Sequence, residues 1–308
     1  MPLPTSGGEA LPLSPERIRS VTPVSPVIAP LAARPEKDME DTPEWAQFKV
    51  RVFKKTGIDL NLYKQQQMHR RLLNMVERAN LKTFGEYFDL IEKDKHEFAI
   101  FLDRMTINVS ELFRNPEKWT ELREKLLAPM LTAKRSLKVW SAGCSYGAEP
   151  YTLAILLNQL APNRGHTIHA TDLDQNILAK ARKGRFTAAD VRNIAPAVLS
   201  ANFAEDTKAS IASPLADTTP RYQVDPRIRS QVTFRAHNLL ADRFETGYDL
   251  ICCRNVVIYF TDDAKNRLFE KFYEALAPGG IFFVGGTERI FNFREIGFTS
   301  PLPFFYQK

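Results

Sequence analysis

From Leu137 onward, short apolar runs alternate with longer stretches in which apolar residues recur at helical spacing. The apolar runs are LKVWSAG, HTIHATDLD, YDLICCRN and GGIFFVGG, and the stretches between them include EPYTLAILLNQL, QNILAKARKG and AKNRLFEKFYEAL. Buried parallel strands are apolar throughout, and their crossover helices cover the sheet, so this alternation predicts strand–helix–strand units. We therefore predict an α/β fold with a parallel sheet covered on both faces.

Two segments depart from this rhythm. Between Phe186 and Phe234 the sequence is rich in Pro, Asp and Thr, with short strand-like pieces such as RYQV and QVTFRA. We interpret this segment as an inserted subdomain, at about residues 187–233, and not as a sixth unit of the sheet. The closing segment FTSPLPFFYQK is aromatic and interrupted by Pro, which favours an antiparallel edge hairpin.

Ahead of the sheet, residues 41–115 carry a helical pattern. A Thr-Pro-Glu start at 42–44 places Pro at the first helical position, and apolar residues follow at helical spacing, namely Trp45, Phe48, Val52 and Phe53. Gly57 is expected to end this helix, and further helical segments are expected at 65–78, at 84–93 and onward through 96–103. The pattern predicts a small all-α domain of three or four short helices, followed by a second domain over residues 116–308.

Residues 1–40 show neither the helical nor the strand spacing of apolar residues, and they contain eight of the 20 prolines. Such a composition cannot bury enough apolar surface to order itself, so we expect a disordered leader. The first residues lack the features of a signal peptide, and no uncharged apolar stretch reaches the ~18 residues that span a bilayer. We therefore expect no membrane insertion and a cytoplasmic location.

The cysteine, histidine and charge content limits the kinds of site that the chain could contain. The three cysteines have no CxxC spacing and the five histidines are scattered, so we expect neither disulfides nor a metal. The net charge of +6 is modest but uneven, because the segment Lys49–Arg78 is rich in Lys and Arg. A solvated helix face is the simpler interpretation of that segment, and an acidic partner is the alternative.

The segment KVWSAGCSYGAEPYTLAILL reads as a strand, a turn and a helix opened by Glu149 and Pro150. Gly143 and Gly147 in the turn would let the backbone approach a ligand, and the helix start offers free amides to an anion. Asp172 follows the next strand and should emerge at the carboxyl edge of the sheet, where it could accept two ribose hydroxyls. The G-x-G-x-x-G fingerprint of nicotinamide-cofactor sites is absent.

An aspartate after a strand can instead cap the next helix, here the one expected near Gln175. We assign that capping role to Asp174 and the ligand role to Asp172.

A further strand, DLICC, leads into polar residues at the same expected edge of the sheet, namely Arg254, Asn255 and Tyr259. Ligands of open α/β sheets bind at this edge, so we expect contact with a substrate. The alternative is a loop that only caps the helix starting near Thr261. The segment MTINVSELFRN precedes the sheet and, from its residues alone, reads as a junction with three polar positions, Asn108, Ser110 and Arg114.

Taken together, the blocks TINVSELFR, WSAGCSYGAEPYT, ATDLD, HNLL and CRNVVIYF, after TGIDLNLYKQQQMHRRL, resemble the CheR-type chemotaxis receptor methyltransferases. The resemblance extends from about Glu44 to Tyr306. It implies a Rossmann-like class I methyltransferase domain that binds S-adenosylmethionine and carries an inserted small β-subdomain. It also implies a helical domain that helps to engage the cytoplasmic part of a membrane chemoreceptor, whose glutamate side chains are methylated.

The resemblance also implies roles for particular residues. Asp172 would hold the ribose, and Asn238 and Leu239 would lie on the adenine side. The residues implied to contact the cofactor or complete the pocket are Asn108, Ser110, Arg114, Arg254, Asn255 and Tyr259.

The chain departs from the family pattern at the glycine turn, where the family usually has two consecutive glutamates after S-T-G. Here Ala148 takes the first position, which leaves Glu149 as the carboxylate that could meet the ammonium group of the cofactor. Near the C-terminus the family's G-H-S-E appears as Gly285-Gly286-Thr287-Glu288. These differences indicate a divergent member.

A glutamate side chain has an ordinary pKa of ~4.3, so it is already a nucleophile at neutral pH and needs no general base. The reaction then requires alignment of the carboxylate, the methyl carbon and the sulfur. We expect Arg114 or Arg254 to hold the carboxylate and Tyr259 to shape the methyl channel.

Two other functions remain open from the sequence. The same fold could methylate a small molecule or RNA, or the chain could be a catalytically weakened signalling module that only binds S-adenosylmethionine. We favour the receptor methyltransferase, acting as a monomer without a nucleic-acid partner.

Overall fold

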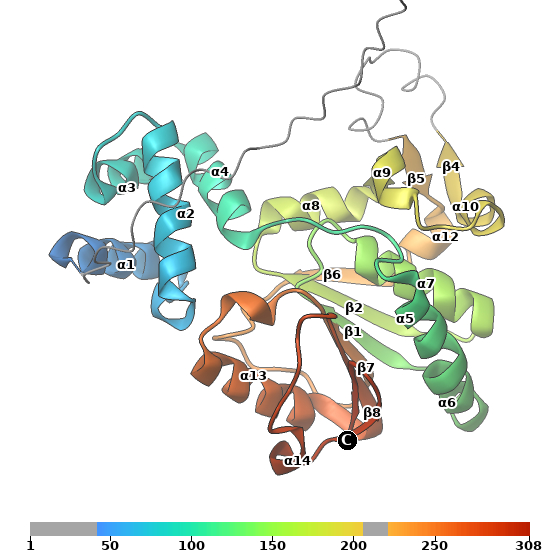
Figure 1. Cartoon of the computed structure of the whole chain (residues 1–308). Helices are drawn as coiled ribbons and strands as arrows, with labels where there is room; N and C mark the ends of the chain where they lie inside the picture. The colour runs from blue at the N-terminus through green and yellow to red at the C-terminus, as the bar shows by residue number, and fades with distance from the viewer. Residues whose placement is uncertain (1–41, 206–220) are drawn as a thin grey trace, which may run out of the picture. The chain divides into compact units, whose positions relative to one another are not determined.

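The computed structural model describes residues 42–205 and 221–308, and the predicted leader lies outside these ranges. The helical domain comes first (Figure 1) and contains α1 (Pro43–Thr56), η1 (Leu60–Leu62), α2 (Gln65–Arg78), α3 (Phe84–Lys93) and α4 (Lys95–Thr106). The hydroxyl of Thr42 caps α1 by accepting from the amide of Trp45, and Gly57 ends it in the left-handed conformation at φ 72°. The predicted helices and the predicted role of Gly57 are confirmed.

The segment predicted to run from α3 into a further helix is divided by Asp94. Its carboxylate accepts hydrogen bonds from the amides of His96 and Glu97, which starts α4 as a separate helix. At the other end of α3, Thr83 and Glu86 form a reciprocal capping box. Local capping therefore explains why two helices form where the apolar pattern alone is nearly continuous.

The sheet domain begins with a helical connection formed by α5 (Pro116–Glu121), the π-helical turn η2 (Leu122–Leu127) and α6 (Ala128–Ala133). A seven-stranded sheet follows, in the order β6-β2-β1-β7-β8-β10-β9. Its strands are β1 (Lys138–Ala142), β2 (Thr167–Asp172), β6 (Val232–Ala236), β7 (Tyr248–Cys253), β8 (Leu276–Val284), β9 (Thr299–Leu302) and β10 (Phe305–Gln307).

The first five strands of that order pair in parallel, as the alternating pattern predicts. At the other edge, β10 pairs antiparallel with both β8 and β9, so the predicted C-terminal edge hairpin is confirmed.

The interpretation of QVTFRA as part of the insertion is wrong. This segment forms β6, which pairs with β2 from Val232 opposite Ile168 to Ala236 opposite Asp172. Its residues alternate between buried and exposed near the start of the strand, as is usual for a sheet edge that is only half covered. The pattern therefore lacks the continuous apolar run that marks the central strands.

A second, three-stranded sheet has two of its strands within the predicted insertion and the third just before it. It has the order β3-β5-β4, with β3 (Arg185–Phe186), β4 (Phe203–Glu205) and β5 (Tyr222–Val224), the last of which contains the predicted strand RYQV. Short helices accompany these strands, namely α9 (Ala188–Val191), α10 (Pro196–Asn202) and α12 (Pro226–Arg229).

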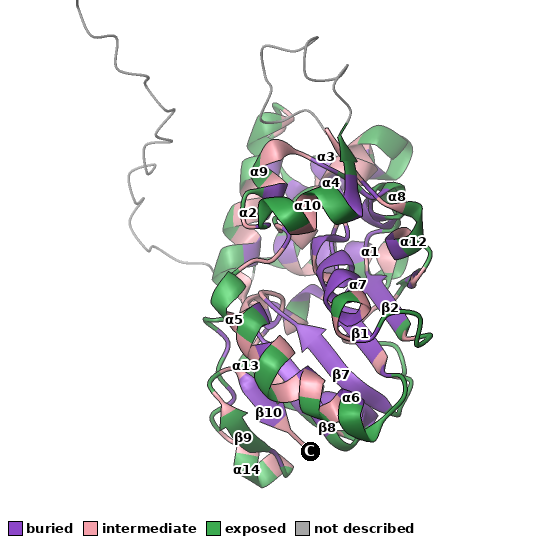
Figure 2. Ribbon diagram, turned by 90° about the vertical axis from the view of Figure 1, so that its right-hand side faces the viewer, coloured by how far each residue is buried: buried purple, intermediate pink, exposed green. Residues whose placement is uncertain are grey.

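The large sheet is buried between two layers (Figures 1 and 2), one with α13 (Asp262–Ala275) and α14 (Phe293–Ile296), the other with α5, α6, α7 (Ala148–Leu160) and α8 (Gln175–Lys183). Alternate residues of one strand serve the two layers, because strand side chains point to opposite faces. On β7, Leu250 and Cys252 pack with α7, while Ile251 and Cys253 pack with α13.

The helical domain joins the sheet domain just after η3 (Val257–Tyr259). The amide of Lys64 donates to the carbonyl of Tyr259, and the amide of Thr261 donates to the carbonyl of Leu62, both at 2.9 Å. Within the described ranges, the helices are too short or too polar to span a bilayer.

Candidate active site

A pocket opens at the carboxyl edge of the sheet, where β1, β2 and β7 end. Its empty space is about 1040 Å³ out to the open mouth, which is at the upper end of the ~300–1,000 Å³ usual for small-molecule sites. The sequence-predicted residues that line it are Asn108, Ser110, Arg114, Gly143, Glu149, Asp172, Asn238, Leu239, Arg254, Asn255 and Tyr259. The residues predicted from the sequence therefore come together from five separate segments of the chain.

The two glycines of the turn after β1 serve the fold more than the ligand. Gly143 has φ 78°, and a Cβ there would meet the Val256 side chain at 2.5 Å. Gly147 has φ 96° and precedes α7, and a Cβ would crowd Tyr151 at 3.1 Å. Gly147 does not line the pocket, so the predicted contact between Gly147 and the cofactor is not supported by its position.

Asp172 ends β2 and faces the pocket. Its carboxylate accepts from the amide of Ser145 at 2.8 Å and from the amide of Asp174 at 3.1 Å, which fixes its orientation. Burial raises the pKa of the Asp172 carboxyl, and the two backbone hydrogen bonds oppose that rise. Asp174 caps α8 by accepting from the amides of Asn176 and Ile177, as predicted.

Glu149 supplies a second carboxylate, in the first turn of α7. It accepts from the Ser141 hydroxyl at 2.7 Å and lies 3.8 Å from the Arg254 guanidinium. Burial raises the pKa of Glu149, and Arg254 opposes that rise. Ala148, by contrast, is fully buried in the core on the α7 side of the sheet. The alanine therefore removes no carboxylate from the pocket wall.

Arg254 is a buried part of the protein frame. Its guanidinium lies between the rings of Trp119 and Phe283, at 5.0 and 4.6 Å from their centroids. Nη2 donates to the carbonyl of Arg114 at 2.9 Å and to the side chain of Asn115 at 3.0 Å. Burial lowers the pKa of Arg254, while Glu149 opposes that change. Through these contacts Arg254 holds the backbone at Arg114 in place.

Residues 107–115, which we call the Arg114 loop, are fixed along their length. The amide of Phe113 donates to Thr152 on α7 and the amide of Leu112 donates to the carbonyl of Asp190, both at 3.0 Å. The Tyr146 hydroxyl donates to the carbonyl of Ser110 and also lies 3.0 Å from the Asp190 carboxylate. The loop thus rests on the glycine turn, on α7 and on the start of the inserted subdomain.

The Arg114 side chain differs from that of Arg254. It lines the pocket and is half-buried, and its guanidinium has no hydrogen-bond or ion-pair partner within residues 42–205 and 221–308. A preorganised backbone with an unpaired cation at the pocket wall is suited to binding an anionic group.

The loop that carries Asn255 is held by a residue that sequence reasoning did not select. Asn255 adopts the left-handed conformation at φ 60°. Glu288, only 4% exposed, accepts from four backbone amides, those of Asn255, Val256, Val257 and Gly285, at 2.6 to 3.0 Å. Burial raises the pKa of Glu288, and these amides oppose the rise. The family pattern G-H-S-E was the signal for this position.

The other predicted residues complete the walls. Asn108 accepts from the Ser145 hydroxyl at 3.1 Å and so connects the end of α4 to the glycine turn. The side-chain oxygen of Asn238 accepts from the amide of Leu240 and orders the loop on which Leu239 enters the pocket. The Tyr259 ring lies beneath the guanidinium of Arg71, with 5.4 Å between the guanidinium carbon and the ring centroid.

Some apolar residues of the pocket wall were not predicted from the sequence. They include Tyr63, Met105, Leu173, Leu240, Val256 and Phe260.

Among the described residues, no group of three or more His, Cys, Asp and Glu is placed to hold a metal ion. The pocket instead combines two oriented carboxylates, an unpaired guanidinium and apolar walls. S-adenosylmethionine carries a ribose diol, an ammonium group, a carboxylate and a flat adenine ring, so the donor and acceptor set fits this cofactor.

Comparison with known families agrees with this chemistry. Residues 43–106 match the family described as "CheR methyltransferase, all-alpha domain", and residues 108–300 match "CheR methyltransferase, SAM binding domain". The two matches meet where α4 ends and the Arg114 loop begins.

Several relatives match most of the chain. A "Chemotaxis protein methyltransferase" of Listeria monocytogenes is 40% identical over 261 residues, which cover 84% of this chain and 95% of that protein. "Chemotaxis protein methyltransferase 1" of Pseudomonas aeruginosa is 32% identical over 256 residues, covering 80% and 89%. "Chemotaxis protein methyltransferase 2" of Vibrio cholerae is 30% identical over 264 residues, covering 82% and 88%. The chain therefore belongs to the CheR methyltransferase family and is an S-adenosylmethionine-dependent methyltransferase.

Proposed function

We propose that this enzyme methylates glutamate side chains on the cytoplasmic helices of a membrane chemoreceptor. The observation that carries the proposal is the unpaired Arg114 guanidinium, held in the same pocket as two oriented carboxylates. The names of the three relatives given above, each a chemotaxis protein methyltransferase, support a receptor of that kind.

The roles of the pocket residues toward the cofactor follow from their chemistry. Asp172 has lone pairs left after its two backbone hydrogen bonds, so it can accept from the ribose hydroxyls. Glu149 can pair with the ammonium group, and Asn238 and Leu239 can flank the adenine. When bound, S-adenosylmethionine supplies a methyl group that leaves its sulfonium sulfur as the new ester C–O bond forms.

For the receptor carboxylate, the contacts favour Arg114 over Arg254. Arg254 is already engaged by two aromatic rings, by Glu149 and by the Arg114 loop, whereas no described residue forms a hydrogen bond or ion pair with the Arg114 guanidinium. A planar guanidinium can orient a carboxylate through two parallel hydrogen bonds, and such alignment is the main requirement of a reaction without a general base. Tyr259 lines the same pocket and would shape the path of the methyl group.

We also propose a role for each domain, a cellular location and an oligomeric state. Residues 41–115 would engage the receptor, residues 116–308 would hold the cofactor, and the enzyme would act as a cytoplasmic monomer. Helix α9, next to the small sheet β3-β5-β4, contacts the Arg114 loop through Asp190, and this subdomain would be a second place for receptor contact.

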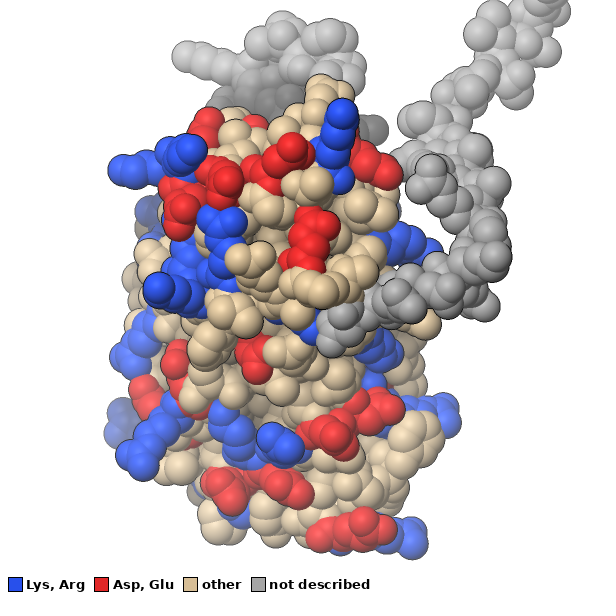
Figure 3. All heavy atoms as spheres, turned by 90° about the vertical axis from the view of Figure 1, so that its left-hand side faces the viewer, with Lys and Arg blue, Asp and Glu red and all other residues tan. Residues whose placement is uncertain are grey.

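The charges on one face of the molecule give no support to the RNA alternative. On the face of the molecule in Figure 3, Lys and Arg side chains are interspersed with Asp and Glu. On α1, for example, Arg51 forms ion pairs with Asp89 and Glu92 of α3 at 2.6 and 3.5 Å. A nucleic-acid site is expected to show a continuous basic surface, which this mixed face does not provide. The intact Glu149 likewise removes the reason for regarding the chain as a binding module without activity.

The test is transfer of a tritiated methyl group from S-adenosylmethionine to the cytoplasmic fragment of a receptor. We expect label that mild base releases as methanol, because a glutamyl methyl ester hydrolyses under those conditions. Label that resists base would contradict the carboxylate substrate, and label only on RNA or a small molecule would favour that alternative.

As the pH is lowered, the affinity for the cofactor should begin to fall at an unusually high pH. Burial raises the pKa of both Asp172 and Glu149, so each carboxylate takes up a proton at a higher pH than the same group does in water and then loses its attraction for the ligand. Calorimetry between pH 8 and about pH 5 should show this decline for the unmodified chain. Glu149→Gln should bind the cofactor more weakly at neutral pH, and its affinity should change less as the pH is lowered. Glu270→Gln, at an exposed position on α13, is the control and should follow the unmodified chain. A pH-independent affinity over this range would contradict the assigned roles.

Tyr146→Phe should slow methyl transfer, because it removes the hydroxyl that links the Arg114 loop to Asp190. The loss of about one hydrogen bond predicts a roughly tenfold lower kcat. Tyr151→Phe is the matched control, since its hydroxyl donates to the carbonyl of Ala181, away from the loop. Equal losses of kcat in the two variants would show that the effect comes from general destabilisation.

A further inference from the structure

Tyr63 belongs to the helical domain, yet its side chain lines the pocket of the sheet domain. It follows η1 and pairs in antiparallel fashion with Phe260. The hydrogen bonds from Lys64 to Tyr259 and from Thr261 to Leu62 flank this pair on both sides. The backbone of Tyr63 is therefore fixed at the junction, and its side chain has a defined position in the pocket wall.

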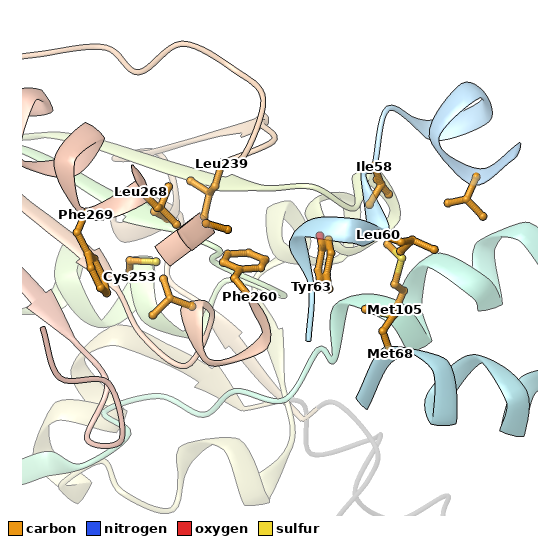
Figure 4. Close-up of a cluster of buried hydrophobic side chains, with 14 of the residues drawn as sticks. Ile58, Leu60, Tyr63, Met68, Met105, Leu239, Cys253, Phe260, Leu268 and Phe269 are labelled. Carbon is orange, nitrogen blue, oxygen red and sulfur yellow. The ribbon is translucent and has the colours of Figure 1, made fainter. Parts of the chain in front are cut away.

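The ring and the hydroxyl of Tyr63 have different surroundings. The ring lies between Phe260 on one side and Leu60 and Met105 on the other (Figure 4), and it meets the Phe260 ring edge-on with centroids 5.2 Å apart. The residue is 8% exposed, and its hydroxyl has no hydrogen-bond partner among the described residues. The hydroxyl is not one of the fully buried side-chain atoms that lack a partner, so it keeps accessible surface in the pocket wall and is available to a ligand there.

Asp172 lies close enough to Tyr63 to influence it. Burial raises the pKa of the Tyr63 phenol, and the charge of Asp172 raises it further. The phenol therefore keeps its proton at neutral pH and acts as a donor. Both groups line the same pocket, one from the end of β2 and the other from the helical domain.

We propose that Tyr63 is a cofactor-binding residue contributed by the helical domain, and that its hydroxyl donates a hydrogen bond to a ribose hydroxyl held by Asp172. A ribose hydroxyl is both donor and acceptor, so one that donates to the Asp172 carboxylate can accept from Tyr63 at the same time. The inference rests on the assignment of Asp172 to the ribose in the proposed function.

This arrangement links cofactor binding to the position of the helical domain. Helix α2 begins at Gln65, two residues after Tyr63, so a ligand that engages Tyr63 also stabilises the docked position of α2. The cofactor site is complete only when both domains contribute to it.

Calorimetry with S-adenosylhomocysteine on the full chain tests the inference. Tyr63→Phe removes only the hydroxyl and should weaken binding about tenfold, the effect of one buried hydrogen bond. Tyr87→Phe is the control, because Tyr87 is buried in the core of the helical domain and does not line the pocket. Its affinity should equal that of the unmodified chain. Without ligand, Tyr63→Phe should be at least as stable as the unmodified chain, because it loses no protein hydrogen bond.

The same titrations with the 2′-deoxy and 3′-deoxy ribose analogues locate the contact. The unmodified chain should discriminate against at least one analogue, and Tyr63→Phe should lose about tenfold of that discrimination. Unchanged affinity of Tyr63→Phe, or equal weakening for the ribose ligand and both analogues, would overturn the proposal. A lower stability of the ligand-free variant would do the same, since it would reveal a protein partner for the hydroxyl. If the unmodified chain bound no S-adenosylhomocysteine, the cofactor assignment itself would fail.

Discussion

Arg114→Ala should lower the rate of methyl transfer by about 100- to 1,000-fold, the usual effect of removing one preorganised charged donor from an active site. The Arg114 guanidinium lines the pocket and has no partner among the described residues, so its loss breaks no contact that supports the fold. The loop around it is held by backbone hydrogen bonds that the substitution leaves intact, including the bond from Arg254 to the Arg114 carbonyl. Methyl transfer to a receptor fragment at saturating cofactor measures this effect.

Two further variants sharpen the prediction for Arg114. Arg114→Lys keeps the charge but loses the planar pair of donors, so its rate should fall between those of Arg114→Ala and the unmodified chain. Arg267→Ala removes an exposed arginine on α13 that does not line the pocket, and it should leave the rate unchanged. A rate for Arg114→Ala within twofold of the unmodified chain would contradict its assignment as the residue that orients the carboxylate.

Glu288→Ala should destabilise the chain by about 3 kcal/mol, because it leaves buried backbone amides without an acceptor. Glu288 accepts from four amides, and it is the contact that fixes Asn255 in its left-handed conformation. The loop from Asn255 to Val257 also packs against Gly143, so its loss should disturb the glycine turn and weaken cofactor binding. Urea unfolding and calorimetry with S-adenosylhomocysteine measure the two effects.

Glu288→Gln separates shape from charge at this position. The amide keeps one acceptor oxygen but directs its own N–H groups at backbone donors, so we expect a substantial part of the destabilisation to remain. Glu295→Ala on α14 removes an exposed carboxylate of the same chain region and should change stability little. If Glu288→Ala unfolded at the same urea concentration as Glu295→Ala, the four-amide contact would not support the loop.

Much of the fold could be predicted because local signals and tertiary packing agree. The ranges expected for α2 and α3 coincide with the observed helices, since each has a clear apolar face and, for α3, a capping box. The strand ends that carry Asp172 and Arg254 were predicted from continuous apolar runs, which mark central parallel strands. In contrast, β6 is an edge strand with exposed positions, and its pattern was mistaken for that of the insertion.

The pocket was predicted less completely because some of its residues act across distant segments. Glu288 lies 31 to 33 positions from the amides of the Asn255 loop, and no local pattern indicates such a contact. Tyr63 comes from a different domain and is surrounded in sequence by mixed polar and apolar residues. Gly147 was expected at the cofactor because it stands in the turn motif, but it packs against Tyr151 and Ala181, and the next residue, Ala148, is part of the core.

The most direct test is a crystal structure of the chain with S-adenosylhomocysteine bound. We predict a ribose hydroxyl within about 3.2 Å of the Asp172 carboxylate, the amino group beside Glu149, and the sulfur facing the side chains of Arg114 and Tyr259. Density for the ligand at another surface, or in this pocket with its ribose away from Asp172, would contradict the assignment of this pocket as the site of methyl transfer.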